Sequence, residues 1–193
     1  MRITESQLRQ LIRKSLLTEA AKRPEDLPSD VGVFASISPS GGSVQYVRPQ
    51  NKVSPVGGKI FWRSNLGANK PYVIQQTYDT TSGYGPMLYD IALELCGARG
   101  LMPDRDEVSA EARSVWNYYM NSRPDVRKVQ MDNPSNELTP VTDDNVEQSS
   151  AEQDGAVKKW MDSPLSKAYI KDNTSTIDRL KALGKWYTYD EVY

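Results

Sequence analysis

The segment that most constrains the fold of this chain is a strand-like run joined to a helix-like run through two glycines. YVIQQTYD at 72–79 has the composition of a strand, and PMLYDIALELCGARG at 86–100 has apolar residues at helical spacing. Pro86 suits the first turn of a helix, where a missing N–H is tolerated and the fixed φ is already helical. The segment therefore predicts a strand, a tight turn through Gly83 and Gly85, and a helix over 86–96 packed on a sheet.

Two interpretations of the glycine turn are open. At the start of a helix the first backbone amides have no partner, and the helix dipole favours an anion such as a pyrophosphate. Glycines also form tight corners that bind nothing. The turn is not a P-loop, because GxxxxGK[ST] is missing, and a dinucleotide-binding fold fits poorly because the third glycine is absent.

Composition excludes several classes of protein. The 193 residues include no histidine, which rules out a Ser-His-Asp triad, a Cys-His pair and ordinary histidine-containing zinc sites. A single cysteine, Cys96, allows no internal disulfide. The net charge of −1 gives no global attraction for nucleic acid, so no nucleic-acid partner is expected.

The hydropathy pattern predicts a soluble chain. No apolar run approaches the roughly 18–20 residues that span a bilayer, and the N-terminus lacks the apolar core of a secretory signal. We therefore expect no membrane partner. The paired acids Asp143 and Asp144 lack spaced neighbours that could complete a cation site, so no metal is expected.

Residues 31–193 are predicted to form one α/β domain with a mixed central sheet, in which the strand 72–79 is central. Further elements are predicted from residue patterning, namely a hairpin over 31–49, a strand over 59–66, helices over 109–122 and 175–183, and a last strand over 185–193. Ser109 is the expected N-cap of its helix, and Gly184 the expected stop of the last one. The stretch 132–155 carries seven acids and no Lys or Arg, which is typical of a solvated loop.

Residues 2–20, RITESQLRQLIRKSLLTEA, are predicted to form an amphipathic helix. Thr4 and Gln7 form a capping-box pattern, and an apolar stripe follows at helical spacing, made of Leu8, Leu11, Ile12 and Leu16. The next segment, 21–30, has two prolines and is typical of a linker. Such a helix can pack on its own domain, dock on a partner protein or lie on a membrane surface.

The stretch YVIQQTYDTTSGYGPMLYDIALELCGARG resembles the central motif of the GNAT acyltransferase superfamily, in which a strand leads into an Arg/Gln-x-x-Gly-x-Gly/Ala loop and a helix. The stretches GYGPMLYDIALE and LMPDRDEVSAEARSVWNYY, and the opening RITESQLRQLI, are also similar to phage-encoded proteins, and the resemblance covers about residues 30–145. The resemblance implies a GNAT-like mixed sheet flanked by helices, with acetyl-CoA as cofactor. The cofactor's pyrophosphate would lie on the loop formed by Thr81, Ser82, Gly83, Tyr84 and Gly85. It also implies a place in the bacterial host cytoplasm or in a virion.

Departures from the family pattern affect the implied chemistry. Thr80 stands where the family has Arg or Gln, which removes a polar contact to phosphate. The tyrosine that protonates the departing thiolate in the family falls on Trp116, whose indole N–H has no useful acidity. Tyr119 is the better substitute after a shift of register, or else it belongs to a core aromatic cluster. Asp79, beside the motif, is the candidate base for an incoming amine.

Two hypotheses follow from these residues. In the first, the chain is an acyl-CoA-dependent N-acyltransferase of GNAT type. In the second, it is a GNAT-like domain without catalysis, used as a virion component or as a docking protein that binds its partner through the stripe at 2–20. The glycines and Pro86 favour the first hypothesis, whereas Thr80 and Trp116 favour the second.

Overall fold

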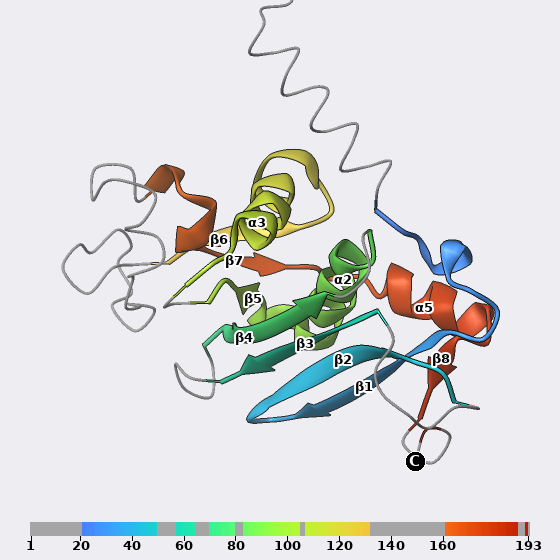
Figure 1. The fold of residues 1–193 in the computed structure, drawn as a ribbon. Helices are drawn as coiled ribbons and strands as arrows, with labels where there is room; N and C mark the ends of the chain where they lie inside the picture. Colours follow the sequence, from blue (N-terminus) through green and yellow to red (C-terminus); the bar gives the residue numbers. More distant parts are fainter. Residues whose placement is uncertain are drawn as a thin grey trace, which may run out of the picture.

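A computed structural model gives the fold and describes residues 21–49, 57–64, 70–79, 83–104, 107–131, 161–188 and 192. Within these residues the protein is an α+β fold, with three α-helices around one curled, mixed sheet of eight strands (Figure 1). The helices are α2 (Gly85–Cys96), α3 (Ala110–Ser122) and α5 (Ser175–Ala182). The strands are β1 (Gly32–Ser38), β2 (Gly41–Val47), β3 (Gly58–Arg63), β4 (Tyr72–Asp79), β5 (Leu101–Met102), β6 (Arg127–Gln130), β7 (Lys167–Ile170) and β8 (Trp186–Tyr187).

The sheet has the strand order β6-β7-β5-β4-β3-β2-β1-β8. Strands β1 to β4 form an antiparallel meander, while β4 pairs with β5, and β1 with β8, in parallel. The parallel pair β4–β5 is connected by α2, as a parallel connection requires a crossover segment. The prediction of a mixed sheet with strand 72–79 near its centre is therefore confirmed.

Helix α2 lies in the middle of the core. It packs against β2, β3, β5 and β7, and α5 packs against α2. Met87, Leu88, Ile91 and Ala92 are buried as the apolar stripe predicted, but Leu93 is 0% exposed as well. A helix covered on more than one side needs apolar residues around more of its circumference than a surface helix does.

The other two helices begin and end as their sequences predicted. The Ser109 side chain accepts a hydrogen bond of 3.2 Å from the Ala112 amide, which caps α3. Gly184, with a φ of 64°, follows the last residues of α5, and its positive φ lets the chain leave the helix without strain. Ile177 and Leu180 of α5 are buried.

Three strands were not predicted from the sequence, and one is shorter than expected. Strands β5, β6 and β7 have two to four residues, too few for an alternating pattern to be read. In the predicted C-terminal strand 185–193, only Trp186–Tyr187 forms a strand among the described residues. These short strands form through their partners: β5 pairs with β4, β7 with β5, β6 with β7, and β8 with β1.

The segment expected to be a linker, 21–30, packs on the domain instead. The Lys22 amide donates a 2.8 Å hydrogen bond to the Gly83 carbonyl, and Leu27 is 4% exposed within the main core. Glu25, in the short 3-10 helix Pro24–Asp26, forms an ion pair with Arg179 of α5. The ordered unit therefore begins before residue 31.

Two other predicted segments lie outside the described residues. These are the amphipathic helix over 2–20, with Leu8, Leu11, Ile12 and Leu16, and the whole acid-rich stretch 132–155. Among the helices that the structure describes, none combines the length and the apolar character needed to cross a bilayer.

Candidate functional site

The corner between β4 and α2 follows the predicted strand, turn and helix. Strand β4 ends at Asp79, Gly83 has a φ of 87°, and α2 begins at Gly85. A positive φ of this size is readily available only to glycine, which explains the residue type at 83. The first amides of a helix have no partner inside it, so α2 presents donors at this corner.

Contacts from two other segments hold the corner in place. The Tyr46 hydroxyl on β2 donates a 2.7 Å hydrogen bond to the Tyr84 carbonyl, and the two rings meet edge to face at 5.2 Å. The Lys22 amide donates to the Gly83 carbonyl at 2.8 Å. Both hydrogen bonds use carbonyl groups of the turn and not its amides.

Beyond Val73, β4 has no pairing partner among the described strands on the side of β5, and this unpaired place in the sheet is called the notch below. Strand β5 pairs with β4 only at Tyr72 and Val73, and then Pro103 follows, which has no N–H to continue a ladder. Strand β4 continues to Asp79, so no described strand pairs with this edge beyond Val73.

The geometry of β4 helps to open this notch. Phe61 on β3 pairs with Gln76 while the next residue, Trp62, pairs with Ile74, so Gln75 is an extra residue on β4. A bulge of this kind bends a strand and increases its twist. The bend falls where β4 and β5 separate, and the free edge of β4 leads into the glycine turn.

The structure places only part of the predicted cofactor loop and base. Gly83, Tyr84 and Gly85 form the corner, as expected. Thr81 and Ser82 lie outside the described residues. Asp79 is the last residue of β4 and pairs with Gly58 through its backbone, while its side chain is not among those described.

Tyr119 is close to the corner but lies in the core. Its side chain is 1% exposed, and its hydroxyl lies 2.9 Å from Asp90 Oδ1 and 3.5 Å from the Pro86 carbonyl oxygen. Burial, together with the negative charge of Asp90, raises the pKa of Tyr119 well above 10. Tyr119 therefore stays protonated at neutral pH, and its proton is directed at Asp90.

The neighbouring aromatic residues show that this cluster is part of the core. Trp116 is also 1% exposed, and its ring lies 5.4 Å from Tyr89, 6.0 Å from Tyr119 and 5.0 Å from Tyr169. Such ring separations are typical of packed aromatic pairs. The positions of both residues favour a packing role.

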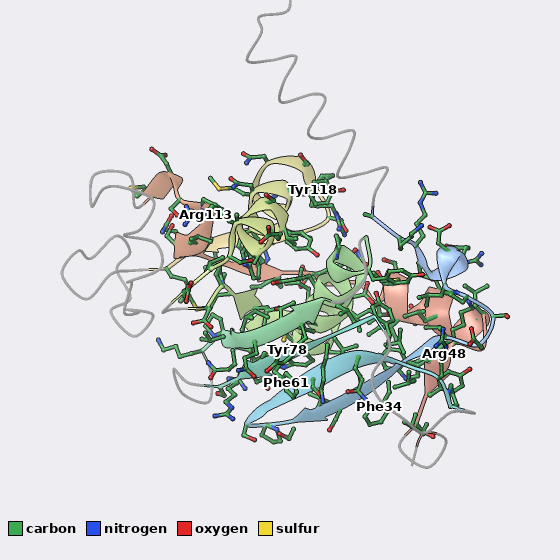
Figure 2. The ribbon with its side chains drawn as sticks, viewed as in Figure 1. Phe34, Arg48, Phe61, Tyr78, Arg113 and Tyr118 are labelled. Atoms are coloured by element: carbon green, nitrogen blue, oxygen red, sulfur yellow. The ribbon has the colours of Figure 1, made fainter. Side chains whose placement is uncertain are left out.

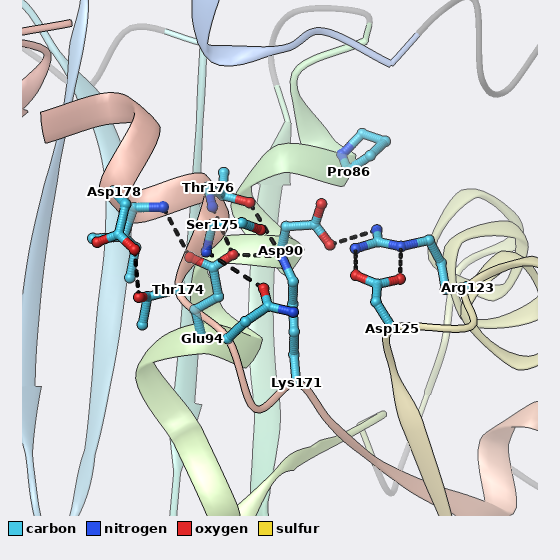
Figure 3. Close-up of polar contacts among 12 residues, drawn as sticks. Pro86, Asp90, Glu94, Arg123, Asp125, Lys171, Thr174, Ser175, Thr176 and Asp178 are labelled. Carbon is cyan, nitrogen blue, oxygen red and sulfur yellow. Dashed lines mark hydrogen bonds and ion pairs between the residues drawn. The ribbon is translucent and has the colours of Figure 1, made fainter. Parts of the chain in front are cut away.

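An ionic cluster follows one turn into α2 (Figure 3). Arg123, just beyond α3, donates from Nη1 to Asp90 Oδ1 at 2.8 Å and makes two hydrogen bonds of 2.7 Å to the Asp125 carboxylate. These hydrogen bonds from Arg123 lower the pKa of Asp125. Sequence reasoning missed this cluster, because Asp90 and Arg123 are 33 residues apart and no local pattern links them.

A second ionic cluster, one further turn along α2, is fully buried (Figure 3). The Glu94 and Lys171 side chains are 0% and 1% exposed and form an ion pair. Glu94 also accepts hydrogen bonds from the amides of Thr176 at 2.9 Å and Ile177 at 2.8 Å. Glu94 of one helix therefore caps the N-terminus of another, α5.

These arrangements differ in what they can do chemically. In both ionic clusters the charged groups are already paired within the protein, which indicates structural roles. Among the described residues, no group of three or more His, Cys, Asp or Glu side chains could hold a metal ion. The β4–α2 corner, meaning residues 83–85 together with the edge of β4 beyond Val73, has Gly83 and Tyr84 partly exposed and Gly85 buried, and it is the candidate site for a ligand that hydrogen-bonds to backbone groups.

Similarity to known proteins gives no independent evidence about this corner. The case for a function therefore depends on the geometry of β4, the turn and α2. No protein-family model matches the chain, and no curated protein and no solved structure matches it either.

Proposed function

We propose that the protein binds an acyl-CoA, with acetyl-CoA as the simplest case, at the β4–α2 corner in the manner of a GNAT-like domain. The observation that carries this proposal is that β4, which pairs with no described strand on this edge beyond Val73, ends at Asp79, four residues before Gly83 of the turn that starts α2. A ligand with both an extended amide-containing arm and a pyrophosphate could use the two features together.

The pyrophosphate is the part of the ligand that suits the turn. Amides at the start of α2 supply hydrogen-bond donors, and the helix dipole adds positive potential there. Gly83 and Gly85 carry no side chain, so phosphate oxygens can approach the backbone closely. Thr80 supplies no positive charge, so the backbone would carry most of this interaction.

The pantetheine arm of CoA suits the edge of β4. This arm contains two amide groups, which can form main-chain-like hydrogen bonds with an unpaired strand edge. Beyond Val73, β4 has such an edge on the side of β5, and the bulge at Gln75 bends it. The thioester would then lie in the notch between β4 and β5.

Acyl transfer needs more than this binding site. A proton donor must reach the departing thiolate, and a base must accept a proton from the amine. Tyr119 is 1% exposed and bonded to Asp90, so it fits a donor role poorly. The proposal is therefore acyl-CoA binding, with N-acyl transfer as the activity to assay once binding is established.

Isothermal titration of the full chain with acetyl-CoA tests the proposal. The parent should bind, and Gly85→Val should abolish binding by placing a side chain where phosphate approaches. Ala98→Val is a matched control just beyond the other end of α2, where the side chain is exposed, and it should bind as the parent does. Far-UV circular dichroism confirms that both variants fold. Equal binding of acetyl-CoA by the parent and by folded Gly85→Val would show that the glycine turn does not bind the ligand.

A second candidate function is partner docking without catalysis, for example in a virion. The burial of Trp116 and Tyr119 favours it, because neither side chain is available as an acid. In this case the segment 2–20 would bind a partner protein through Leu8, Leu11, Ile12 and Leu16. Leu11→Asp should then abolish association and leave the domain folded, as judged by co-purification and circular dichroism. Unfolding of the domain by Leu11→Asp would contradict docking.

A further inference from the structure

The sheet formed by β1 to β4 has one face away from α2, called the open face below. Val44, Ile60 and Trp62 belong to the core on the α2 side, and Thr77 bonds to Tyr89 of α2. Alternate residues point to the other face. The register aligns these residues in two cross-strand rows, which are Ser36, Ser43, Phe61 and Gln76, and Phe34, Gln45, Lys59 and Tyr78.

Only one end of the open face is covered by the described residues. Phe34 and Val47 are buried against Val192, with Tyr187 packed beside them. Towards β3 and β4 the face is accessible, and Tyr78 is 52% exposed.

Two aromatic rings lie side by side on the accessible part of the open face (Figure 2). The Phe61 and Tyr78 ring centroids are 6.4 Å apart, with an angle of 84° between the ring planes. The Tyr78 hydroxyl donates a 2.9 Å hydrogen bond to Gln76 Oε1, which holds the ring in place. Exposed aromatic rings on a sheet are platforms on which bases of single-stranded nucleic acids stack.

Positive charge accompanies these rings. Lys59, Phe61 and Arg63 alternate along β3 and so share the open face, and Lys59 Nζ lies 4.2 Å from the Phe61 ring centroid. The sequence from 31 to 78 contains five cations, Arg48, Lys52, Lys59, Arg63 and Lys70, and no Asp or Glu; Asp30 and Asp79 flank this range, and Asp30 is paired with Arg48. The net charge of the whole chain is near zero, but the meander β1–β4 carries an excess of positive charge, which suits a polyanion.

A pocket of about 570 Å³ opens on the same face. Its lining includes Ser36, Ser43, Phe61, Arg63 and Gln76. Hydroxyl and amide groups can hydrogen-bond to base edges or sugars, and Arg63 can pair with a phosphate. A volume in this range is typical of small-ligand sites, so it can accept part of a polynucleotide.

We propose that the open face binds single-stranded nucleic acid, with bases stacked on Phe61 and Tyr78 and phosphates paired with Lys59 and Arg63. An acidic peptide would satisfy the cations but would leave the paired rings without a function. A duplex would keep its bases stacked on one another, out of reach of the rings. This site is distinct from the β4–α2 corner, so the two proposals can fail separately.

Fluorescence anisotropy with a labelled 12-nucleotide oligothymidylate tests this proposal on the full chain. We expect binding at low salt that weakens as salt rises. Lys59→Ala/Arg63→Ala should weaken binding at least tenfold and reduce the slope of log affinity against log salt by about 1.4, for two lost phosphate contacts. Tyr78→Ala should weaken binding several-fold with an unchanged salt slope, whereas Tyr78→Phe, which keeps the ring, should bind as the parent does.

Matched controls distinguish binding through the open face from non-specific binding to any positive charge on the protein. Arg127 is an exposed cation on β6, at the far edge of the sheet, so Arg127→Ala should leave binding unchanged. A 12-base-pair duplex should bind more weakly than the single strand. The proposal is overturned if the parent does not bind the oligonucleotide at low salt, if the duplex binds equally well, or if folded Tyr78→Ala binds as tightly as the parent.

Discussion

Two carboxylates on α2, Asp90 and Glu94, lie one helical turn apart and meet their cations in different surroundings. The Glu94–Lys171 pair is 0% and 1% exposed, whereas the exposures of Asp90 and Arg123 are 21% and 15%. Water can reach the outer pair if it is broken, but it cannot reach the inner one. The same type of ion pair should therefore matter much more at Glu94 than at Asp90.

The largest effect is expected from removing the inner carboxylate. Glu94→Gln leaves Lys171 buried without a counter-charge and weakens the cap of α5. Breaking a buried pair in this way costs about 3–5 kcal/mol of unfolding free energy. Urea denaturation monitored by circular dichroism measures the loss. A loss below about 1 kcal/mol would mean that solvent reaches the pair.

A double variant sharpens the interpretation of this result. Glu94→Leu/Lys171→Met removes both charges, so no charged group remains unpaired in the core. The loss should be smaller than for Glu94→Gln, with a remainder of about 1–2 kcal/mol from the uncapped amides of α5. If the double variant is less stable than the single one, the charges themselves contribute net stability.

A smaller effect is expected at the outer pair. In Asp90→Asn the amide oxygen can still accept a hydrogen bond from Tyr119, and Arg123 keeps its two hydrogen bonds to Asp125. We expect a loss of about 1–2 kcal/mol in the same urea experiment. A loss as large as that of Glu94→Gln would contradict the comparison.

The outer cluster should also show a dependence on alkaline pH. The pKa of Tyr119 is raised by burial and by Asp90, so its stabilising contribution is present below about pH 10 and is lost as pH rises further. Each such group contributes a slope of about 1.4 kcal/mol per pH unit. Tyr119→Phe should make the decline in stability above pH 10 less steep. Some decline should remain, since burial also raises the pKa values of Cys96 and Tyr169.

The smallest effect is expected at a pair on the surface. The Glu25 and Arg179 side chains are 44% and 52% exposed, although they form a direct ion pair as Glu94 and Lys171 do. Glu25→Gln should change the unfolding free energy by no more than about 0.5 kcal/mol, and added salt should reduce the difference. A larger loss would indicate that the segment 21–30 depends on this contact to pack on α5.

The elements that could be predicted from sequence are those with strong local signals. Strand β4, the glycine turn and α2 were predicted because the strand-like composition of 72–79, Gly83 and Pro86 each carry local information. Strand β5 was missed because Leu101–Met102 becomes a strand only through its partner β4. Its shortness also creates the notch, so this part of the candidate site had no sequence signal of its own.

The ionic clusters could not be predicted, for a different reason. Glu94 and Lys171 are 77 residues apart, and each is a common residue type on a protein surface. Helical spacing predicted the buried stripe of Met87, Leu88, Ile91 and Ala92, whereas the structure also buries Leu93 and Glu94. Only the position of α5 on the other side of α2 explains why a charged residue is buried there.

The separation between Glu94 and Lys171 also has a consequence for the newly synthesised chain. At typical rates of translation, roughly 4–15 s pass between the addition of residue 94 and the addition of residue 171. During that interval the meander and α2 can emerge from the ribosome, but the cation that neutralises Glu94 and the helix that covers it do not yet exist. The exposed side of α2 is then a natural binding site for a chaperone, and a ribosome stalled before residue 171 would hold a chain whose core cannot close.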